Sequence, residues 1–157
     1  LAIHSYPAAD RGFFVNQEGD LFRLYRWVAG SQPAQADEAL RFTTYDAAGD
    51  RAAYAARRAE NLNEVVLFDG VTGTRQVLGT SEDPFLYLTL SRDGSTVLVT
   101  QLAGDKVDYL SASSRSGMVL KPHPKLPRAR PGQVRMTVDG KRFCLYNSEG
   151  LRVVDLP

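Results

Sequence analysis

The chain of 157 residues is 43% hydrophobic and 24% charged, a composition typical of a folded domain that excludes a disordered chain. Nineteen basic and eighteen acidic residues leave a net charge of +1, so overall charge does not direct the protein to nucleic acid. The single cysteine excludes an intrachain disulfide. No apolar run approaches the roughly 20 residues of a membrane helix, and residues 1–7 lack a secretory signal pattern. The sequence therefore predicts no membrane span and assigns no compartment.

Glycines punctuate the sequence at a regular interval. One set, at predicted tight turns, recurs after 45 and 46 residues at Gly49, Gly94 and Gly140. A second set, at the ends of predicted strands, recurs after 43 and 44 residues at Gly30, Gly73 and Gly117. Two sets with nearly one period indicate about four copies of one supersecondary unit. We expect them to form a single domain over residues 1–157, with approximate units 1–38, 39–81, 82–126 and 127–157.

Each unit consists of short predicted strands separated by Asp-Gly, Gly-Asp or Glu-Gly turns. In unit one, residues 13–15 and 21–27 are predicted strands. In unit two, the alanine-rich residues 52–59 have helical propensity. They follow the same turn as the apolar residues 96–100 of unit three, so we predict a strand there as well.

Continuous apolar runs at residues 65–68 and 96–100 indicate strands that are buried on both faces. The sequence signal for a fourth strand is weaker, with candidates at 75–78 and 118–121. Unit one offers only the polar segment 31–39 in that place, and unit four ends without a fourth strand. The predicted units therefore contain three to four strands each.

Several motifs carry a family resemblance. Residues 50–58 read Asp-Arg-Ala-Ala-Tyr-Ala-Ala-Arg-Arg, and an apolar strand ending in Asp at 64–69 and a Thr-Gly pair at 72–73 follow. Ser-Arg-Asp-Gly at 91–94 departs from Ser-Pro-Asp-Gly only at the proline, and Val-Asp-Gly-Lys-Arg at 138–142 keeps the turn. Outside unit one, these motifs resemble the TolB-like, WD-type β-propeller repeat. The resemblance implies an all-β, propeller-like fold of about four blades, each of three to four antiparallel strands.

Four blades are few for a closed propeller, and three arrangements remain open. The chain forms a small four-bladed ring, or it is part of a larger propeller completed by another chain or by further sequence, or two copies join as half-rings in a homodimer. In the first arrangement, a strand at residues 1–5 could complete the last blade and close the ring. An open arc would leave unpaired edges and an exposed apolar flank, which proteins normally cover.

The sequence contains no catalytic or metal-binding constellation that we recognise. His4 and His123 have no Cys, Asp or Glu at metal-ligand spacing, and no Gly-x-Ser-x-Gly nucleophile elbow is present. Asp46 and Asp50 flank a turn and are expected to form Asx turns rather than a calcium site. Cys144 lies in an apolar strand and is expected to be buried and unreactive. We therefore predict no catalytic residue, no metal and no cofactor.

The segment at residues 121–131 interrupts the repeat. It contains four prolines and no acidic residue, so we expect an extended basic connector that could bind an acidic partner. A rigid, solvated connector between blades is the alternative. The candidate binding residues in this segment are Lys121, His123, Lys125, Arg128 and Arg130.

Two further places are candidates for binding. The basic pair Arg57 and Arg58 follows a predicted strand, although the family repeat supplies an arginine there for structural reasons. Alternation along residues 21–27 puts Arg23, Tyr25 and Trp27 on one face of a strand. This face would be an interface anchor if it is exposed, with Trp27 as its largest side chain.

These observations predict a non-catalytic interaction module that binds a protein or peptide through propeller loops or the channel rim, with an acidic surface as the favoured kind of partner. The alternatives are the non-catalytic propeller portion of a larger hydrolase or peptidase, and a sensor domain that binds a small ligand.

Overall fold

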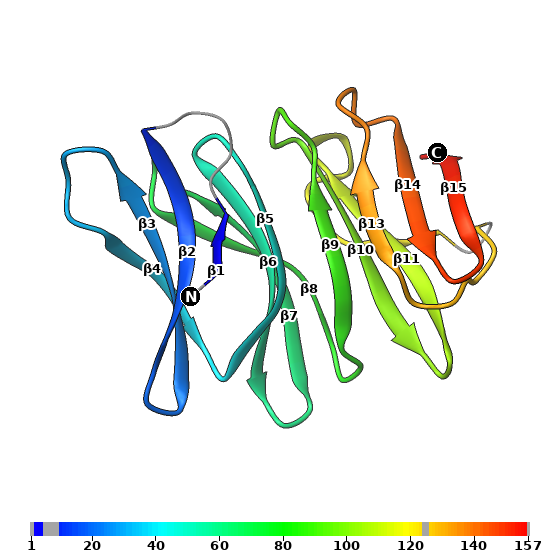
Figure 1. Cartoon of the computed structure of the whole chain (residues 1–157), viewed down its shortest axis with the longest axis horizontal. Helices are drawn as coiled ribbons and strands as arrows, with labels where there is room; N and C mark the ends of the chain where they lie inside the picture. Colours follow the sequence, from blue (N-terminus) through cyan, green and yellow to red (C-terminus); the bar gives the residue numbers. More distant parts are fainter. Residues whose placement is uncertain (1, 5–9, 124–125, 157) are drawn as a thin grey trace.

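The computed structural model describes residues 2–4, 10–123 and 126–156, which form four antiparallel sheets side by side (Figure 1). We name the sheets blades 1 to 4 in chain order. Blade 1 consists of β1 (Ala2–His4), β2 (Arg11–Glu18), β3 (Leu21–Val28) and β4 (Ala34–Ala39). Blade 2 consists of β5 (Arg41–Ala48), β6 (Arg51–Ala59), β7 (Leu62–Asp69) and β8 (Thr74–Ser81). Blade 3 consists of β9 (Phe85–Leu90), β10 (Thr96–Ala103), β11 (Lys106–Ser113) and β12 (Lys121–Pro122). Blade 4 consists of β13 (Gln133–Met136), β14 (Arg142–Asn147) and β15 (Gly150–Asp155).

Every blade pairs its strands in chain order, and the first strands of blades 2, 3 and 4 lie together, with β9 between β5 and β13. A single 3-10 turn, η1 (Ser114–Ser116), follows β11, and residues 2–4, 10–123 and 126–156 contain no α-helix. The prediction of an all-β, propeller-like fold with blades of three to four strands is confirmed. The alanine-rich segment of unit two is the strand β6, as predicted.

The row of blades is open. Blades 1 and 4 lie at opposite ends of it in Figure 1, so the chain forms a partial propeller rather than a small closed ring. The prediction that a strand at residues 1–5 completes the last blade is wrong for residues 2–4, the described part of that range. Ala2–His4 pairs with β2 of its own blade, and the register of this pair places Ile3 opposite Phe14. Residues 1 and 5 lie outside the described residues.

The fourth strands differ from the prediction in two blades. The polar segment of unit one does form a fourth strand, β4, which pairs with β3 through its backbone. An edge strand needs no apolar side chains to make these hydrogen bonds. In unit three the pairing starts only at Lys121, because Met118 has a φ of 55° and turns the chain before it.

Three apolar cores lie between the four blades, one at each junction. Between blades 1 and 2 lie Phe13, Leu24, Tyr54, Val66 and Phe68. Between blades 2 and 3 lie Ala53, Val65, Leu88, Val97 and Val99. Between blades 3 and 4 lie Leu98, Tyr109, Val134, Phe143 and Leu145. Neighbouring residues of β6 and of β10 contribute to different cores, because side chains alternate between the two faces of a strand. The predicted burial on both faces of the apolar runs is thus confirmed.

The turn from the first to the second strand is held alike in blades 3 and 4. The Ser91 hydroxyl donates to the Asp93 carboxylate at 2.7 Å, and the Thr137 hydroxyl donates to Asp139 at 2.6 Å. The hydrogen bond from Ser91, together with those from the residues that follow, lowers the pKa of Asp93 to about 2. Gly94 adopts a φ of +69°, a conformation that glycine tolerates at little cost. The recurring glycine and the recurring hydroxyl therefore have one structural role, to set this turn.

A chain of hydrogen bonds, which we call the inner-strand relay, ties the first strands together. The Asp46 carboxylate of β5 accepts the N–H of Leu90 at 2.9 Å and the hydroxyl of Thr89 at 3.2 Å. The Thr89 Oγ1 in turn accepts the N–H of Met136 of β13 at 3.2 Å. Asp46 is only 9% exposed. One buried carboxylate thus begins a relay that links blades 2, 3 and 4.

A second polar cluster, the Asp37 network, ties blade 1 to blade 2. The Tyr54 hydroxyl donates to Asp37 of β4 at 2.6 Å, and Arg58 and Arg75 form ion pairs with the same carboxylate. Both guanidinium groups also contact Glu64. Burial acts to raise the pKa of Asp37, but the hydrogen bonds from Arg58 and Tyr54 outweigh burial and hold this pKa below its usual value. Asp37 is therefore ionised at neutral pH.

Replacing Asp46 by alanine should destabilise the fold by about 2–3 kcal/mol, because the N–H of Leu90 and the hydroxyl of Thr89 lose a charged acceptor. Urea denaturation of the wild type and the variant measures the difference in the free energy of unfolding. Asp105→Ala, in an exposed turn, is the matched control and should be close to neutral. Equal stability of Asp46→Ala and the wild type would contradict a structural role for the relay.

The Asp37 network should make stability depend on pH in a defined direction. The pKa of Asp37 is lower in the folded state than the value near 3.9 expected for the unfolded chain. Its contribution is thus complete above the unfolded value and is lost as the pH falls through the folded one. We expect the gap in unfolding free energy between the wild type and Asp37→Asn to be constant from pH 7 to 5 and to shrink toward pH 3. Urea titrations at these pH values measure it, and an unchanged gap at pH 3 would refute the assignment.

Candidate functional site

A cavity of about 380 Å³ opens where the first strands of blades 2, 3 and 4 run into their turns. We call it the inner-strand cavity. Residues from β5, β9 and β13 and from the turns after them line it, among them Asp46, Leu90, Arg92, Arg135, Met136 and Val138. The inner-strand relay forms part of this lining and fixes the three strands against one another. The cavity is therefore built on the most constrained part of the fold.

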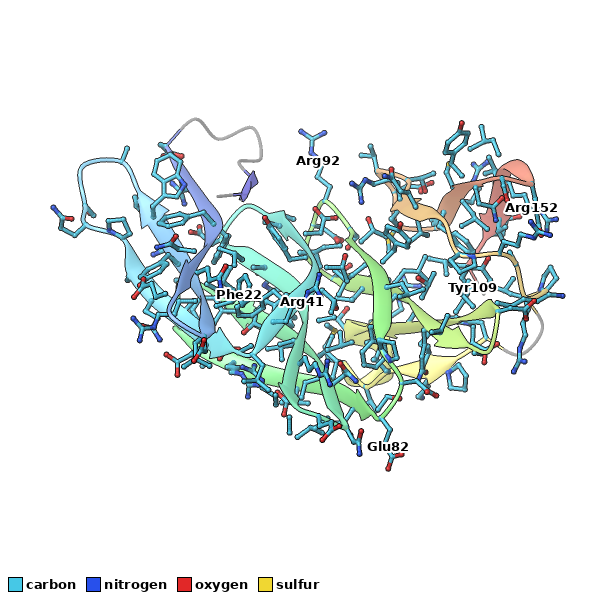
Figure 2. The ribbon with its side chains drawn as sticks, turned by 60° about the horizontal axis from the view of Figure 1, so that its bottom comes forward. Phe22, Arg41, Glu82, Arg92, Tyr109 and Arg152 are labelled. Carbon is cyan, nitrogen blue, oxygen red and sulfur yellow. The ribbon has the colours of Figure 1, made fainter. Side chains whose placement is uncertain are left out.

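The acidic groups near the inner-strand cavity have hydrogen-bond partners, whereas the basic groups there have no acidic partner within the described residues. The Asp46 carboxylate is used by the relay, and the Asp93 carboxylate is used by its own turn. Arg92 and Arg135 are exposed, and neither has a carboxylate partner within the described residues. Figure 2 shows Arg92 projecting from its turn away from the body of the protein. Arg92 thus stands at the rim of the cavity, and Arg135, which the register places opposite Cys144, stands on the adjoining open face of blade 4.

Apolar groups lie beside these cations. Leu90 and Met136 line the cavity, and Val138 is 73% exposed at its edge. The hydroxyls of Ser91 and Thr137, which lie near the same strand ends, are used within their turns. This arrangement suits a ligand that presents a carboxylate next to an apolar group, such as an acidic peptide.

No cluster of three or more histidine, cysteine or acidic side chains that could hold a metal ion occurs within the described ranges. In the same part of the chain, no helix is long and apolar enough to cross a membrane.

The structure scatters the basic residues predicted at 121–131. Lys121 is exposed on β12, and His123 shares a 2.6 Å hydrogen bond with Ser111 while burial lowers its pKa. Arg128 forms two hydrogen bonds with Asp108, the shorter of 2.6 Å. Arg130 lies 4.0 Å from Glu149, and Lys125 lies outside the described residues. Both described arginines of this segment thus have acidic neighbours in their own chain.

The other predicted binding residues lie far from this segment. Arg57 is exposed, and its guanidinium donates to the backbone carbonyls of Ala59 and Glu60. Arg58 is part of the Asp37 network, which agrees with the structural role that the family repeat implies. Trp27 is half-buried on the outer face of blade 1.

Two expectations about single residues need correction. Cys144 is half-exposed rather than buried, because it lies on the face of β14 that no other blade covers. Asp50 pairs with Arg11 and Arg26 of blade 1, so this turn residue serves as a contact between blades.

Sequence reasoning missed the two cavity arginines, although one signal was present. Arg92 stands where the family repeat has proline, within Ser-Arg-Asp-Gly, and an arginine in a tight turn has no structural task there. Arg135 carries no comparable signal, since only the packing of β9 against β13 brings it near Arg92.

No protein-family model matches the sequence, and no curated protein matches it. Solved structures do resemble the fold. TolB from Acinetobacter baumannii superposes with a TM-score of 0.68 at 18% identity, over 92% of this chain and 38% of that one. The β-propeller domain of Myceliophteria thermophila Cps50 (Swd1) gives 0.64 at 12% identity, over 99% and 53%.

A third likeness is to the structure of a prolyl endopeptidase, with a TM-score of 0.60 at 12% identity over 99% of this chain and 26% of that one. The chain thus spans about half or less of the length of each of these proteins. Since the identities are low, the likeness concerns the fold, and the first strands that line the cavity correspond to the strands that surround a propeller channel. The chain has the fold of a partial β-propeller.

Proposed function

We propose that the protein is a non-catalytic interaction module that binds an acidic peptide segment of a partner protein at the inner-strand cavity. The observation that carries this proposal is the pair of exposed arginines, Arg92 and Arg135, beside an apolar cavity. Guanidinium groups bind carboxylates through charge-assisted hydrogen bonds, and an adjacent apolar surface adds contact area. Propellers commonly place their binding loops at one rim of the channel, which is where this cavity lies.

The segment 121–131 supports this role less directly. Arg128 and Arg130 have Asp108 and Glu149 as neighbours, so a partner would have to compete with carboxylates of the same chain. Lys121 is exposed on β12, the outer strand of blade 3. We propose that the inner-strand cavity, rather than this segment, selects the ligand.

The alternative role is that of the propeller portion of a larger hydrolase. The fold likeness to a prolyl endopeptidase favours it, and the chain matches 26% of that protein. In such a role the rim of the channel would face a catalytic domain rather than a free peptide. The two roles differ in what the purified chain binds, and the acidic-peptide experiment below separates them.

Replacing Arg92 and Arg135 together by glutamine should weaken binding of an acidic peptide by at least tenfold, because each lost charge-assisted hydrogen bond is worth roughly 1.5–3 kcal/mol. A fluorescein-labelled peptide with four glutamates and two leucines serves as the probe, and its fluorescence anisotropy measures binding. Binding by the wild type should also fall as salt is raised.

Arg41→Gln is the matched control, since this exposed arginine begins the same inner strand that carries Asp46 at its other end (Figure 2). It should bind the peptide as the wild type does. A lysine-containing peptide of equal length should not bind. Equal affinity of the double variant and the wild type would overturn the proposed site.

A further inference from the structure

The outer face of blade 4 is apolar and uncovered. Tyr146 and Leu151 are each 67% exposed, and Val153 is 57% exposed. The register pairs Tyr146 with Leu151 and Cys144 with Val153, so all four lie on one face. The opposite face packs against blade 3. Blade 4 therefore has one core face and one face of similar composition that lacks a neighbour.

The same positions are buried in an interior blade. Leu67 stands two residues before Asp69 at the end of β7, as Val153 stands two residues before Asp155 at the end of β15. Leu67 is only 8% exposed because blade 3 packs on that face. The open face of blade 4 is thus a blade-packing face rather than an ordinary surface.

A polar contact repeats in the same way. In blade 2, the Nε of Arg51 pairs with Asp69 at 3.3 Å, while its Nη1 donates to the carbonyl of Gly94 in the turn of blade 3 at 3.0 Å. In blade 4, the Nε of Arg142 pairs with Asp155 at 3.6 Å. Arg142 therefore has the contact within its own blade, and the described residues contain no turn of a following blade that it could reach.

The junction of blades 1 and 2 shows what such a turn can offer. Arg11, at the position of Arg51, donates from Nη1 to the carboxylate of Asp50 at 2.7 Å. Asp50 directly precedes Arg51, and Asp10 directly precedes Arg11. The carboxylate of Asp10 accepts hydrogen bonds from the Nε and Nη2 of Arg11, at 3.1 and 3.0 Å, and its side chain is still 54% exposed. Blade 1 thus carries an acceptor of the kind that an arginine of a neighbouring blade uses, and no blade among the described residues lies against this side of it.

The outer face of blade 1 also has the character of a packing face. Phe14 and Tyr25 stack there with ring centroids 5.2 Å apart, and Trp27 lies on the same face. On blade 2 the corresponding face carries Tyr54 and Phe68, which are buried against blade 1. Both ends of the row therefore present surfaces made for another blade.

We propose that a second copy of this chain covers both end faces. Blade 4 of each copy packs on blade 1 of the other, and Arg142 of one copy binds Asp10 of its partner as Arg11 binds Asp50 within the chain. The two contacts are equivalent by a twofold axis, so they close a ring of eight blades, within the range that propellers use.

A second copy fits the observations better than an unrelated protein. The charges and apolar groups needed at the junction are all present on the two ends of this chain. The chain covers 53% of the Swd1 propeller domain, so two copies together would match about the whole length of that domain. Further blades of another origin would show themselves as a failure of the chain to self-associate.

Sedimentation velocity of the purified chain from 1 to 100 µM tests the proposal. We expect a dimer, and we expect Cys144, on the covered face, to react with a thiol reagent at least tenfold more slowly in the dimer than in dilute solution. Arg142→Glu and Asp10→Arg should each weaken the dimer at least tenfold. An equal mixture of the two variants should restore it, because both junctions of the mixed dimer then pair opposite charges.

Val71→Lys is the matched control, since Val71 is 74% exposed in the turn between β7 and β8 and should leave the dimer intact. Restoration by mixing also shows that the variants are folded. A chain that stays monomeric at every concentration would overturn the proposal. Dimers that persist in both single variants, or a mixture that fails to dimerise, would overturn it as well. None of these results depends on the acidic peptide, so this proposal and the proposed function can fail separately.

Discussion

Both faces of a propeller blade must be covered, and this constraint explains the distribution of residues along the whole chain. Val97, Leu98 and Val99 of β10 are consecutive and all fully buried. Since neighbouring side chains point to opposite faces, such a strand is stable only between two other layers. Interior blades 2 and 3 meet this condition within the chain. Blades 1 and 4 have one neighbour each among the described residues, and the exposed Tyr146, Leu151 and Val153 of blade 4 are the consequence.

A related constraint acts on the backbone N–H groups of the inner strands, which need hydrogen-bond acceptors. The first strand of each blade is an edge strand, so its outward N–H groups have no partner within the sheet. The N–H groups of Leu90 and Met136 are satisfied by Asp46 and Thr89 of the preceding blade. A buried carboxylate is costly to desolvate, but the Asp46 carboxylate accepts three hydrogen bonds here, and an unsatisfied backbone group would also be costly. The relay thus aligns the blades, whereas the apolar cores hold them together.

The sequence predicted the features that recur in every unit. The period of the turn glycines and the Asp-Gly turns led to four sheets, because each turn needs a glycine conformation and a hydroxyl or carboxylate to hold it. The fourth strand of unit one was missed because Asp37 and Glu38 make it look like a loop, although an outer strand pairs through its backbone. Cys144 was misjudged for another reason. Apolar neighbours indicate a strand, but which face is covered depends on whether a further blade is present.

The candidate site was less predictable, since it arises where three units meet. Ala47 and Ala48 line the inner-strand cavity opposite Leu90 and Met136, and these small side chains leave space that larger ones would fill. Arg92 stands on a turn and packs against no core, so its identity can change the ligand without disturbing the blades. Arg135 is different, because the register places it opposite Cys144, on the open face of blade 4. Any blade that covers this face changes the surroundings of one of the two cavity cations.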